Sequence, residues 1–249
     1  MKYEFEYIEG IRASFEALDH NVPIIEIFIG DFIDLSKNSK IAKIKARAHK
    51  AKIKVKLVNK NELYRMSNRG SHQGIITKVK AYEYENLSNI IEGAKYKDKS
   101  LICILDHITD SGNLGAIARS AEAFGADGLI IANKRAAGIT ASTYKTSAGA
   151  ICNLPIAKVS NINATLAELK NNRYWIAAAS EHADKNIWEE NLKGKIAIVM
   201  GSENSGVSSL VLKNSDFKIK LPLFGDTESL NVAQAFSACA YEWIRQNFS

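Results

Sequence analysis

Cysteine and proline are scarce in this sequence, and long apolar runs are missing. The 249 residues include three cysteines and three prolines. The cysteines, Cys103, Cys152 and Cys239, are widely spaced among apolar neighbours, which predicts reduced, buried thiols rather than a disulfide framework. No apolar run approaches the roughly 18 residues that a membrane span needs, and the start of the chain lacks the basic-then-apolar pattern of a secretory signal. We therefore expect a globular, cytoplasmic protein.

Several familiar chemical signatures are absent as well. The sequence contains neither the GxGxxG turn of dinucleotide-binding folds nor the GxxxxGK[ST] phosphate loop. Its five histidines form no HExxH motif, and no cysteine pair stands at metal-binding spacing, so we expect no metal site. The stretch GSENSG at 201–206 is not a GxSxG elbow, because a glutamate holds the central position. These absences exclude the commonest oxidoreductase, NTPase and serine hydrolase signatures.

Positive charge is concentrated in the N-terminal third of the chain. Residues 1–82 carry 16 Lys/Arg against 9 Asp/Glu, a net charge of +7, whereas residues 83–249 carry 17 against 18, a net charge of −1. Between Ser36 and Arg69, 12 basic residues accompany a single acid, Glu62. A concentration of this kind attracts polyanions, so nucleic acid is the expected partner.

The basic block has the periodicity of folded structure. Its first half repeats basic residues at helical spacing, with apolar residues on another side of the helix. Its second half alternates, which predicts a strand whose lysines face solvent and whose apolar side chains, including Leu57, are buried. This surface either binds RNA or is a solvated face without a partner. The residues expected to contact RNA are Lys43, Arg47, Lys52, Lys54 and Lys56.

The pattern of predicted elements divides the chain into two domains. Around the basic block, helices are expected at 10–18 and 61–67, and strands at 24–30 and 72–82. The stretch 83–100 is polar, weakly periodic and rich in turn-forming residues, which is typical of a connector. The sequence thus predicts a small α/β RNA-binding domain over 1–82, a linker over 83–100 and a second domain over 101–249.

The second domain alternates short apolar runs with helical stretches and ends in a long helix. Such alternation predicts an α/β fold with a largely parallel sheet covered by helices on both faces. In sheets of this kind, ligands bind beyond the carboxyl ends of the strands.

Three short polar stretches follow predicted strands in this domain. The first contains Asn113, where a helix cap is expected, and Arg119, which is either functional or a salt-bridged or snorkelling side chain. The second places Glu203 in a glycine-flanked loop, which suits either a ligand or a plain turn. The third places Ser229 and Asn231 before the last helix, where they could simply cap it.

Together the three stretches resemble a known family. NLGAIARSA at 113–121, IVMGSENSGVS at 198–208 and LPLFGDTESLNVAQAFSACAYE at 221–242 are similar, in order and spacing, to the three motifs of the SpoU (TrmH) RNA ribose 2′-O-methyltransferases of the SPOUT superfamily. YIEGIRASFEAL at 7–18 and SHQGIITKVKAY at 71–82 resemble the two ends of the small substrate-binding domain of members that methylate a guanosine of 23S ribosomal RNA.

The resemblance implies a fold and a cofactor. It implies a deep trefoil knot in the C-terminal domain. Protein chains ordinarily do not pass through their own loops, and hydrophobic periodicity cannot reveal such a knot. The strand ends and knotted loops would form an S-adenosylmethionine pocket, with the backbone around Gly201, Leu221 and Leu230 holding the adenosine part.

The resemblance also implies roles for the polar residues. Arg119 would face the transferred methyl group, hold an RNA phosphate and help to deprotonate the ribose 2′-hydroxyl. Because the free pKa of arginine exceeds about 12, we expect its positional and electrostatic role to matter more, with Glu203 or water taking the proton. The other residues expected around the ribose are Asn113, Glu203, Ser229 and Asn231.

Alternatives stay open at this stage. The resemblance implies a homodimer and a methyltransferase acting on ribosomal RNA. The alternatives are a transfer-RNA 2′-O-methyltransferase and a non-catalytic RNA-binding or ribosome-assembly factor that keeps the fold. The intact polar motifs favour an enzyme, and binding of the cofactor would separate the enzymes from the assembly factor.

Overall fold

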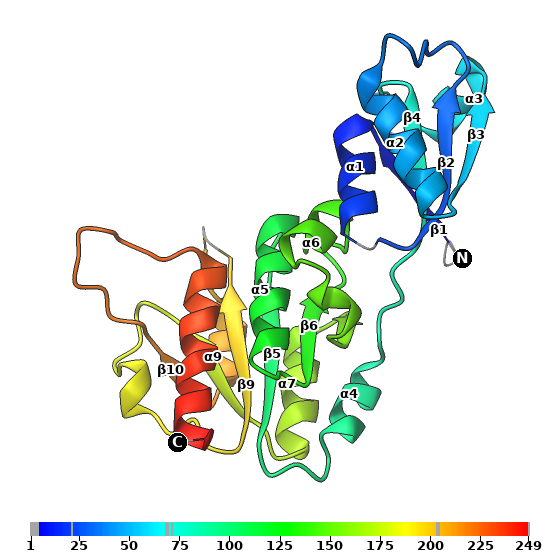
Figure 1. Cartoon of the computed structure of the whole chain (residues 1–249). Helices are drawn as coiled ribbons and strands as arrows, with labels where there is room; N and C mark the ends of the chain where they lie inside the picture. Colours follow the sequence, from blue (N-terminus) through cyan, green and yellow to red (C-terminus); the bar gives the residue numbers. More distant parts are fainter. Residues whose placement is uncertain (1–4, 21, 68–69, 71, 203–204, 249) are drawn as a thin grey trace. The chain divides into compact units, whose positions relative to one another are not determined.

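The computed structural model describes residues 5–20, 22–67, 70, 72–202 and 205–248. The chain divides into two compact units (Figure 1). The N-terminal unit comprises Met1–Glu83 and, unexpectedly, a segment from the middle of the sequence, Ile139–Gly149. The C-terminal unit comprises Tyr84–Gly138 and Ala150–Ser249.

The N-terminal unit contains a mixed four-stranded sheet in the order β1-β4-β2-β3. β2 and β3 are parallel, and β4 lies antiparallel between β1 and β2. The strands are β1 (Phe5–Glu9), β2 (Ile24–Gly30), β3 (Lys54–Val58) and β4 (Ile75–Lys80). The helices are α1 (Ile11–Asp19), α2 (Ser39–Lys50), α3 (Lys60–Met66) and α6 (Ala141–Thr146).

The two faces of this sheet are covered unequally. On one face, Ile27 and Ile29 of β2 pack against Ile41 and Ile44 of the amphipathic helix α2, and all four are fully buried. On the other face, Leu63 of α3 packs with Phe28, Val58 and Ile76 of the strands. Two helices begin at asparagine caps: the Asn38 side chain accepts the Ile41 N–H, and Asn59 forms a capping box with Glu62.

The basic strand is shorter than its alternating pattern predicts. Lys52 lies before β3, in a turn with a φ of 58°, because the Ile53 N–H bonds back to the Ala48 carbonyl and continues the end of α2. Leu57 was expected to be buried and is instead 61% exposed, because β3 is the edge strand of the sheet. Lys54 and Lys56 do project from one face of the strand, as predicted.

The C-terminal unit is built on a six-stranded, entirely parallel sheet in the order β10-β8-β9-β5-β6-β7, as the alternation of elements predicts. Its strands are β5 (Ser100–Asp106), β6 (Gly128–Ala132), β7 (Ile156–Val159), β8 (Trp175–Ala179), β9 (Lys195–Gly201) and β10 (Phe217–Ile219). Its helices are α4 (Leu87–Gly93), α5 (Ser111–Ala123), α7 (Ile162–Asn171), α8 (Ser209–Asn214) and α9 (Val232–Phe248), with 3₁₀ turns η1 (Ala150–Cys152) and η2 (Ile187–Glu189).

Helices cover both faces of this sheet, so its central strands are apolar throughout. Every residue of β5 is buried. Ile102 and Ile104 point to the face covered by α4, α7 and α8, and the alternate residues, among them Cys103, point to the face covered by α5 and α9. Figure 1 shows α5 and α9 side by side on that face.

Part of the expected connector is ordered structure. Helix α4 lies within 83–100, and its Ile90 and Ile91 are buried in the core of the C-terminal unit. Three apolar residues, Leu87, Ile90 and Ile91, in an otherwise polar segment were too weak a periodic signal to predict this helix. The prediction of buried thiols is confirmed for Cys103 and Cys239 and is wrong for Cys152, which is exposed at the end of η1.

The trefoil knot concerns threading rather than strand pairing, and it stays a prediction. Among the described residues, no helix is both long and apolar enough to cross a bilayer.

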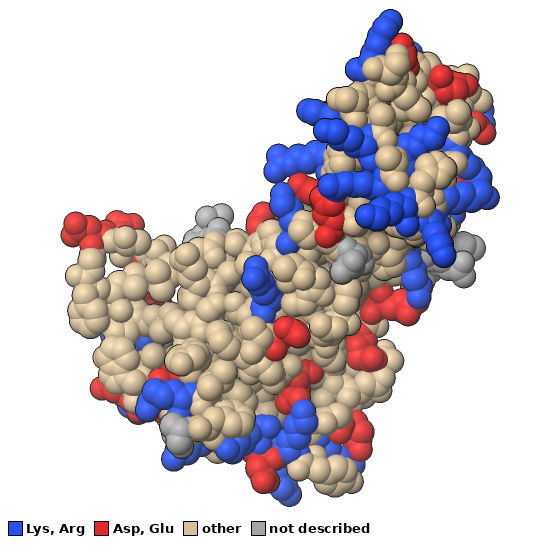
Figure 2. Space-filling view, viewed as in Figure 1, with Lys and Arg blue, Asp and Glu red and all other residues tan. Residues whose placement is uncertain are grey.

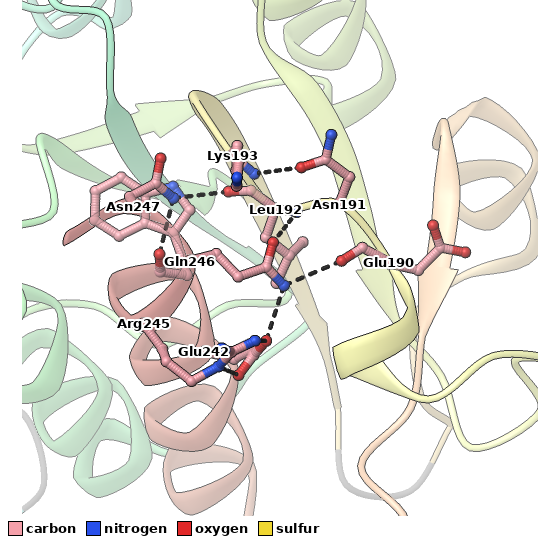
Figure 3. Close-up of polar contacts among 9 residues, drawn as sticks. Glu190, Asn191, Leu192, Lys193, Glu242, Arg245, Gln246 and Asn247 are labelled. Carbon is pink, nitrogen blue, oxygen red and sulfur yellow. Dashed lines mark hydrogen bonds and ion pairs between the residues drawn. The ribbon is translucent and has the colours of Figure 1, made fainter. Parts of the chain in front are cut away.

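The end of α9 is fixed to the segment that leads into β9 (Figure 3). The Gln246 side chain accepts the Leu192 N–H at 2.8 Å and donates to the Glu190 carbonyl at 3.1 Å. The buried Asn247 side chain donates to the Leu192 carbonyl at 2.9 Å and accepts the Gly194 N–H at 2.8 Å. These bonds fix the C-terminal end of α9 against the start of β9.

Replacing Asn247 should therefore destabilise the C-terminal unit. Asn247→Ala removes the side-chain partners of the buried Leu192 carbonyl and of the partly buried Gly194 N–H, which should lower the free energy of unfolding by about 1–3 kcal/mol. Denaturant unfolding measures this. The control is Asn191→Ala, since Asn191 is exposed and, among the described residues, accepts only the Lys193 N–H. This variant should cost about 0.5 kcal/mol or less. Equal stability of the two variants would contradict the anchoring role.

Candidate functional site

A cavity of about 810 Å³ lies at the carboxyl ends of three strands in the C-terminal unit. Its walls come from the ends of β8, β9 and β10, the loop 220–231 and the first turns of α9. This is the edge at which parallel sheets bind ligands, and the volume lies in the usual range for small-molecule sites. The cavity is lined by Gly201, Leu221, Ser229 and Leu230, four residues that the sequence predicted for the site.

The strand end at Gly201 can hold only glycine. A Cβ atom built at this position would lie 2.0 Å from the Gly206 carbonyl carbon and 2.1 Å from the Val207 nitrogen. The chain returns this closely because Ser202 and Gly206 exchange backbone hydrogen bonds of 3.1 and 2.8 Å, and Gly206 has a φ of 63°. Gly201 therefore shapes the cavity wall by allowing a tight turn against the strand.

Asp106 is a buried carboxylate that the sequence analysis missed. It ends β5, is 1% exposed, and lies in register beside Gly201. Its Oδ2 accepts the Ser208 N–H at 2.8 Å, and its Oδ1 lies 2.6 Å from Nδ1 of His107. Asp106 thus fixes the far end of the turn that begins at Gly201. The sequence did contain a signal that could have identified Asp106, namely an acidic residue at the end of an otherwise apolar strand.

Two of the predicted polar residues meet across 118 positions of sequence. The Asn231 Nδ2 donates to the Asn113 Oδ1 at 2.9 Å. Asn231 also accepts the Ala233 N–H at 2.9 Å, so it caps α9, which was the alternative role for this residue. The prediction that Asn113 caps α5 is wrong, because Asp110 accepts the Asn113 N–H at 2.7 Å and is itself the cap. Asn113 lies one turn inside the helix, which leaves its side chain available for Asn231.

Arg119 is exposed on α5, two turns after Asn113 in the sequence. Within the described parts of the chain it has neither an ion pair nor a hydrogen bond. The described residues therefore give no support to the alternative that Arg119 is a salt-bridged structural side chain. Nearby in sequence, Ser120 contacts Ser237 of α9, with 2.7 Å between the two Oγ atoms. This small-residue contact lets α5 and α9 pack closely.

Ser229 and Glu203 are the remaining residues predicted for the catalytic site. Ser229 is exposed on the cavity rim. Glu203 lies outside the described residues.

The cavity combines an apolar interior with a polar rim. Val207, Leu221 and Cys239 contribute apolar surface, and burial raises the pKa of the Cys239 thiol to about 12, so this group stays protonated and uncharged at neutral pH. The rim carries Glu181, His182, Asn186, Lys220, Glu228 and Ser229. A ligand with an apolar ring system and a charged or polar tail suits such a lining.

The basic residues predicted to contact RNA lie in the N-terminal unit, where Figure 2 shows Lys and Arg concentrated. Lys56 and Lys54 both turn toward Glu26 of the neighbouring strand, at 3.0 and 3.6 Å. Arg47 is ion-paired with Asp19 and lies over the Phe15 ring. Lys43 is exposed, and no carboxylate of the described residues pairs with it. The five cations are thus divided between α2 with the turn that follows it and the strand β3.

No group of three or more His, Cys, Asp or Glu side chains suited to a metal ion occurs among the described residues.

Comparison with protein families assigns both parts of the chain. Residues 100–241 match the SpoU rRNA Methylase family, and residues 7–85 match the RNA 2′-O ribose methyltransferase substrate binding family. Among curated proteins, the chain is 32% identical over 247 residues to the TrmH-family protein YacO of Bacillus subtilis, covering 99% of this chain and 98% of that protein. It is 36% identical over 240 residues to a TrmH-family protein of Staphylococcus aureus, covering 96% and 95%.

Solved structures share the fold of the whole chain. The SpoU methyltransferase AviRb from Streptomyces viridochromogenes, in complex with AdoMet, matches with a TM-score of 0.68 and 22% identity over 98% of this chain and 90% of its own. An AdoMet-bound rRNA methyltransferase from Sinorhizobium meliloti matches with a TM-score of 0.66 and 21% identity over 99% and 89%. The matched families span both units. The chain therefore belongs to the SpoU (TrmH) family of RNA 2′-O-methyltransferases and carries the family's N-terminal substrate-binding domain.

Proposed function

We propose that this protein transfers a methyl group from S-adenosylmethionine to the ribose 2′-hydroxyl of a guanosine in 23S ribosomal RNA. The observation that carries the proposal is the hydrogen bond between Asn113 and Asn231. It joins the first and third polar motifs directly beside Leu230 and Val232, which line the cavity. A plain structural role for both motifs does not require them to meet at the mouth of a ligand-sized cavity.

The cavity residues fit the cofactor. Gly201, Leu221 and Leu230 offer an apolar cradle with backbone donors and acceptors, which suits an adenosine, and the rim of Glu181, His182 and Glu228 suits a charged amino-acid tail. When bound, S-adenosylmethionine supplies a methyl group that is already a strong electrophile.

The chain's own residues then have to position and activate the hydroxyl. Arg119, exposed and unpaired among the described residues, would hold a phosphate and the ribose through its planar fork. Asn113, Asn231 and Ser229 would orient the ribose by hydrogen bonds. Glu203 or water would accept the hydroxyl proton, because a guanidinium is a poor base.

The RNA substrate class follows from the N-terminal unit. A separate basic domain of the substrate-binding family supports a large, folded RNA, with contacts from Lys43, Arg47, Lys52, Lys54 and Lys56. Ribosomal RNA fits this better than transfer RNA, which remains the second candidate because curated relatives carry tRNA/rRNA names. A domain boundary near residues 83–100 would separate binding of the RNA from catalysis.

We also propose a homodimer. Tyr241 of α9 is 62% exposed and stacks edge-on against Phe124 at the end of α5, with 6.0 Å between ring centroids. An exposed tyrosine packed on a half-buried phenylalanine, at the two helices that carry Arg119 and follow Asn231, suits a contact between two copies.

The proposed reaction is tested by mapping 2′-O-methyl ribose in ribosomal and transfer RNA from cells with and without the gene. Loss of one 2′-O-methylguanosine in 23S RNA, restored by the intact gene, is the expected result. Loss of a transfer-RNA methylation instead would establish the second candidate.

Gly201→Ala should weaken cofactor binding without unfolding the protein. Its methyl group would collide with the Gly206–Val207 backbone and displace the turn. The wild type should bind S-adenosylhomocysteine with a Kd of about 1 μM, and the variant at least about tenfold more weakly. Calorimetry measures both. Gly225→Ala, on the loop 220–231 with open space around the added Cβ, is the control and should bind normally. If a well-folded Gly201→Ala protein bound the cofactor with wild-type affinity, the turn at Gly201 would not form a wall of the cofactor site.

Arg119→Ala should separate catalysis from folding. Because the side chain is exposed, the variant should melt, dimerise and bind cofactor like the wild type. Methyl transfer to unmodified ribosomal RNA should fall by about 100-fold or more, which corresponds to about 2.7 kcal/mol in the barrier. Arg119→Lys should recover little of the rate, because lysine lacks the planar fork.

Arg173→Gln, at another exposed arginine of the C-terminal unit, controls for the loss of one charge and should retain the rate. Near-normal turnover in folded Arg119→Ala would move the activating role to another residue.

A further inference from the structure

A hollow with an apolar floor and a basic rim lies between α1 and α2 of the N-terminal unit. Ile11 and Phe15, one turn apart on α1, form its floor, and both are only partly buried against the core. Lys40 and Lys43, one turn apart on α2, form one wall. Gln73, before β4, closes the end, and its Oε1 accepts the Ile11 N–H at 3.2 Å.

The electrostatic balance of the hollow is positive. Lys40, Lys43 and Arg12 line it together with one acid, Glu16. Partial burial favours the protonated form of Glu16, but hydrogen bonds from Lys145 and Arg12 outweigh it and hold the pKa of this carboxyl below its usual value. Glu16 is therefore ionised at neutral pH and already shared by two cations. Lys40 and Lys43 remain exposed and, among the described residues, without a carboxylate partner.

The aromatic floor is held in a defined orientation. The Arg47 guanidinium lies over the Phe15 ring, 5.3 Å from its centroid, and is ion-paired with Asp19. This fixes Phe15 from the side of α2 while part of the ring stays at the hollow. Aromatic rings beside cations form the recurring arrangement for unpaired bases, since every base has a face that stacks.

We propose that this hollow binds one unpaired nucleotide of the RNA substrate, with the base against Ile11 and Phe15 and the adjoining phosphates on Lys40 and Lys43. This inference rests on the proposed RNA substrate and specifies where the N-terminal unit holds it. Gln73 adds two amide donors at the end of the hollow, which can meet acceptors on a base edge.

The distribution of charge favours the hollow, rather than strand β3, as the place that RNA contacts first. Lys54 and Lys56 share the carboxylate of Glu26, which is 8% exposed, so an RNA phosphate would have to compete with an existing pair. Beyond the hollow, Lys40, Lys43, Arg47 and Lys50 recur at intervals of three and four along α2, which places them in one stripe down the helix. A strand leaving the hollow could follow that stripe.

The first test measures RNA binding by the full chain. The probe is a short fluorescein-labelled single-stranded RNA of mixed sequence, titrated at several salt concentrations. Lys40→Gln combined with Lys43→Gln should weaken binding at least about tenfold and lower the log–log salt slope by about 1.4, because each lost single-strand phosphate contact removes about 0.7. An unchanged slope overturns the proposal.

The matched control removes the same charge elsewhere in the unit. Lys60 and Arg65 are exposed on α3, which packs against the opposite face of the sheet. Lys60→Gln combined with Arg65→Gln should leave the slope within about 0.3 of the wild type. If the salt slope fell as much as in the Lys40 and Lys43 variant, RNA binding would depend only on net charge. That result would also overturn the proposed nucleotide site.

A second variant addresses the base rather than the phosphates. Phe15→Leu keeps apolar contact with the core and removes the ring, so it should weaken single-strand binding about fivefold or more and leave binding of the annealed duplex unchanged. Crosslinking with 4-thiouridine RNA should label peptides that contain Phe15 or Lys43. Labelling confined to the peptide around Lys54 and Lys56 would contradict the proposal even if Phe15→Leu folded poorly.

Failure of this inference is distinguishable from failure of the proposed function. S-adenosylhomocysteine binding and methylation of ribosomal RNA by the wild type do not depend on where the nucleotide is held. If the wild type methylates its RNA and the Lys40 and Lys43 variant binds normally, the hollow is wrong and the function stands. If the wild type transfers no methyl group, the proposed function is wrong. The RNA-binding measurements then still show whether the hollow binds a nucleotide.

Discussion

The candidate site depends on one constraint, the tight turn that leaves β9 at Gly201. Its return is close enough that even a methyl group at Gly201 would overlap the backbone of Gly206 and Val207. The buried carboxylate of Asp106, on the neighbouring strand, holds the far end of the turn through the Ser208 N–H. A polar group this deeply buried requires hydrogen-bond partners. Without this pair of restraints the cavity would lose one wall.

The two units divide the work of the protein. Most of the positive charge belongs to the N-terminal unit, whereas the C-terminal unit is nearly neutral and carries the cavity. An electrostatic surface acts over about 10 Å at ordinary salt, while positioning a ribose for methyl transfer requires groups held far more precisely. This separation lets one surface attract a long polyanion while another performs the chemistry.

Much of the fold could be predicted from the sequence, because the parallel sheet follows from repeated apolar runs such as that of β5. Of the predicted site residues, four from the second and third motifs line one cavity: Gly201, Leu221, Ser229 and Leu230. The Asn113–Asn231 contact could not be predicted, since a hydrogen bond across 118 positions leaves no local pattern. Asp110 capped α5 in place of Asn113 because both are good caps and only geometry decides between them. Helix α4 and the roles of Asp106 and the α1–α2 hollow depend on tertiary packing.

The central claim is that the cavity under the loop 220–231 holds S-adenosylmethionine. A crystal structure of the protein with S-adenosylhomocysteine tests this most directly, because it places the ligand without relying on activity. We expect the adenosine between Gly201, Leu221 and Leu230, with the amino-acid tail toward the polar rim. Ligand density at another place, with this cavity empty in the same crystal, would contradict the account.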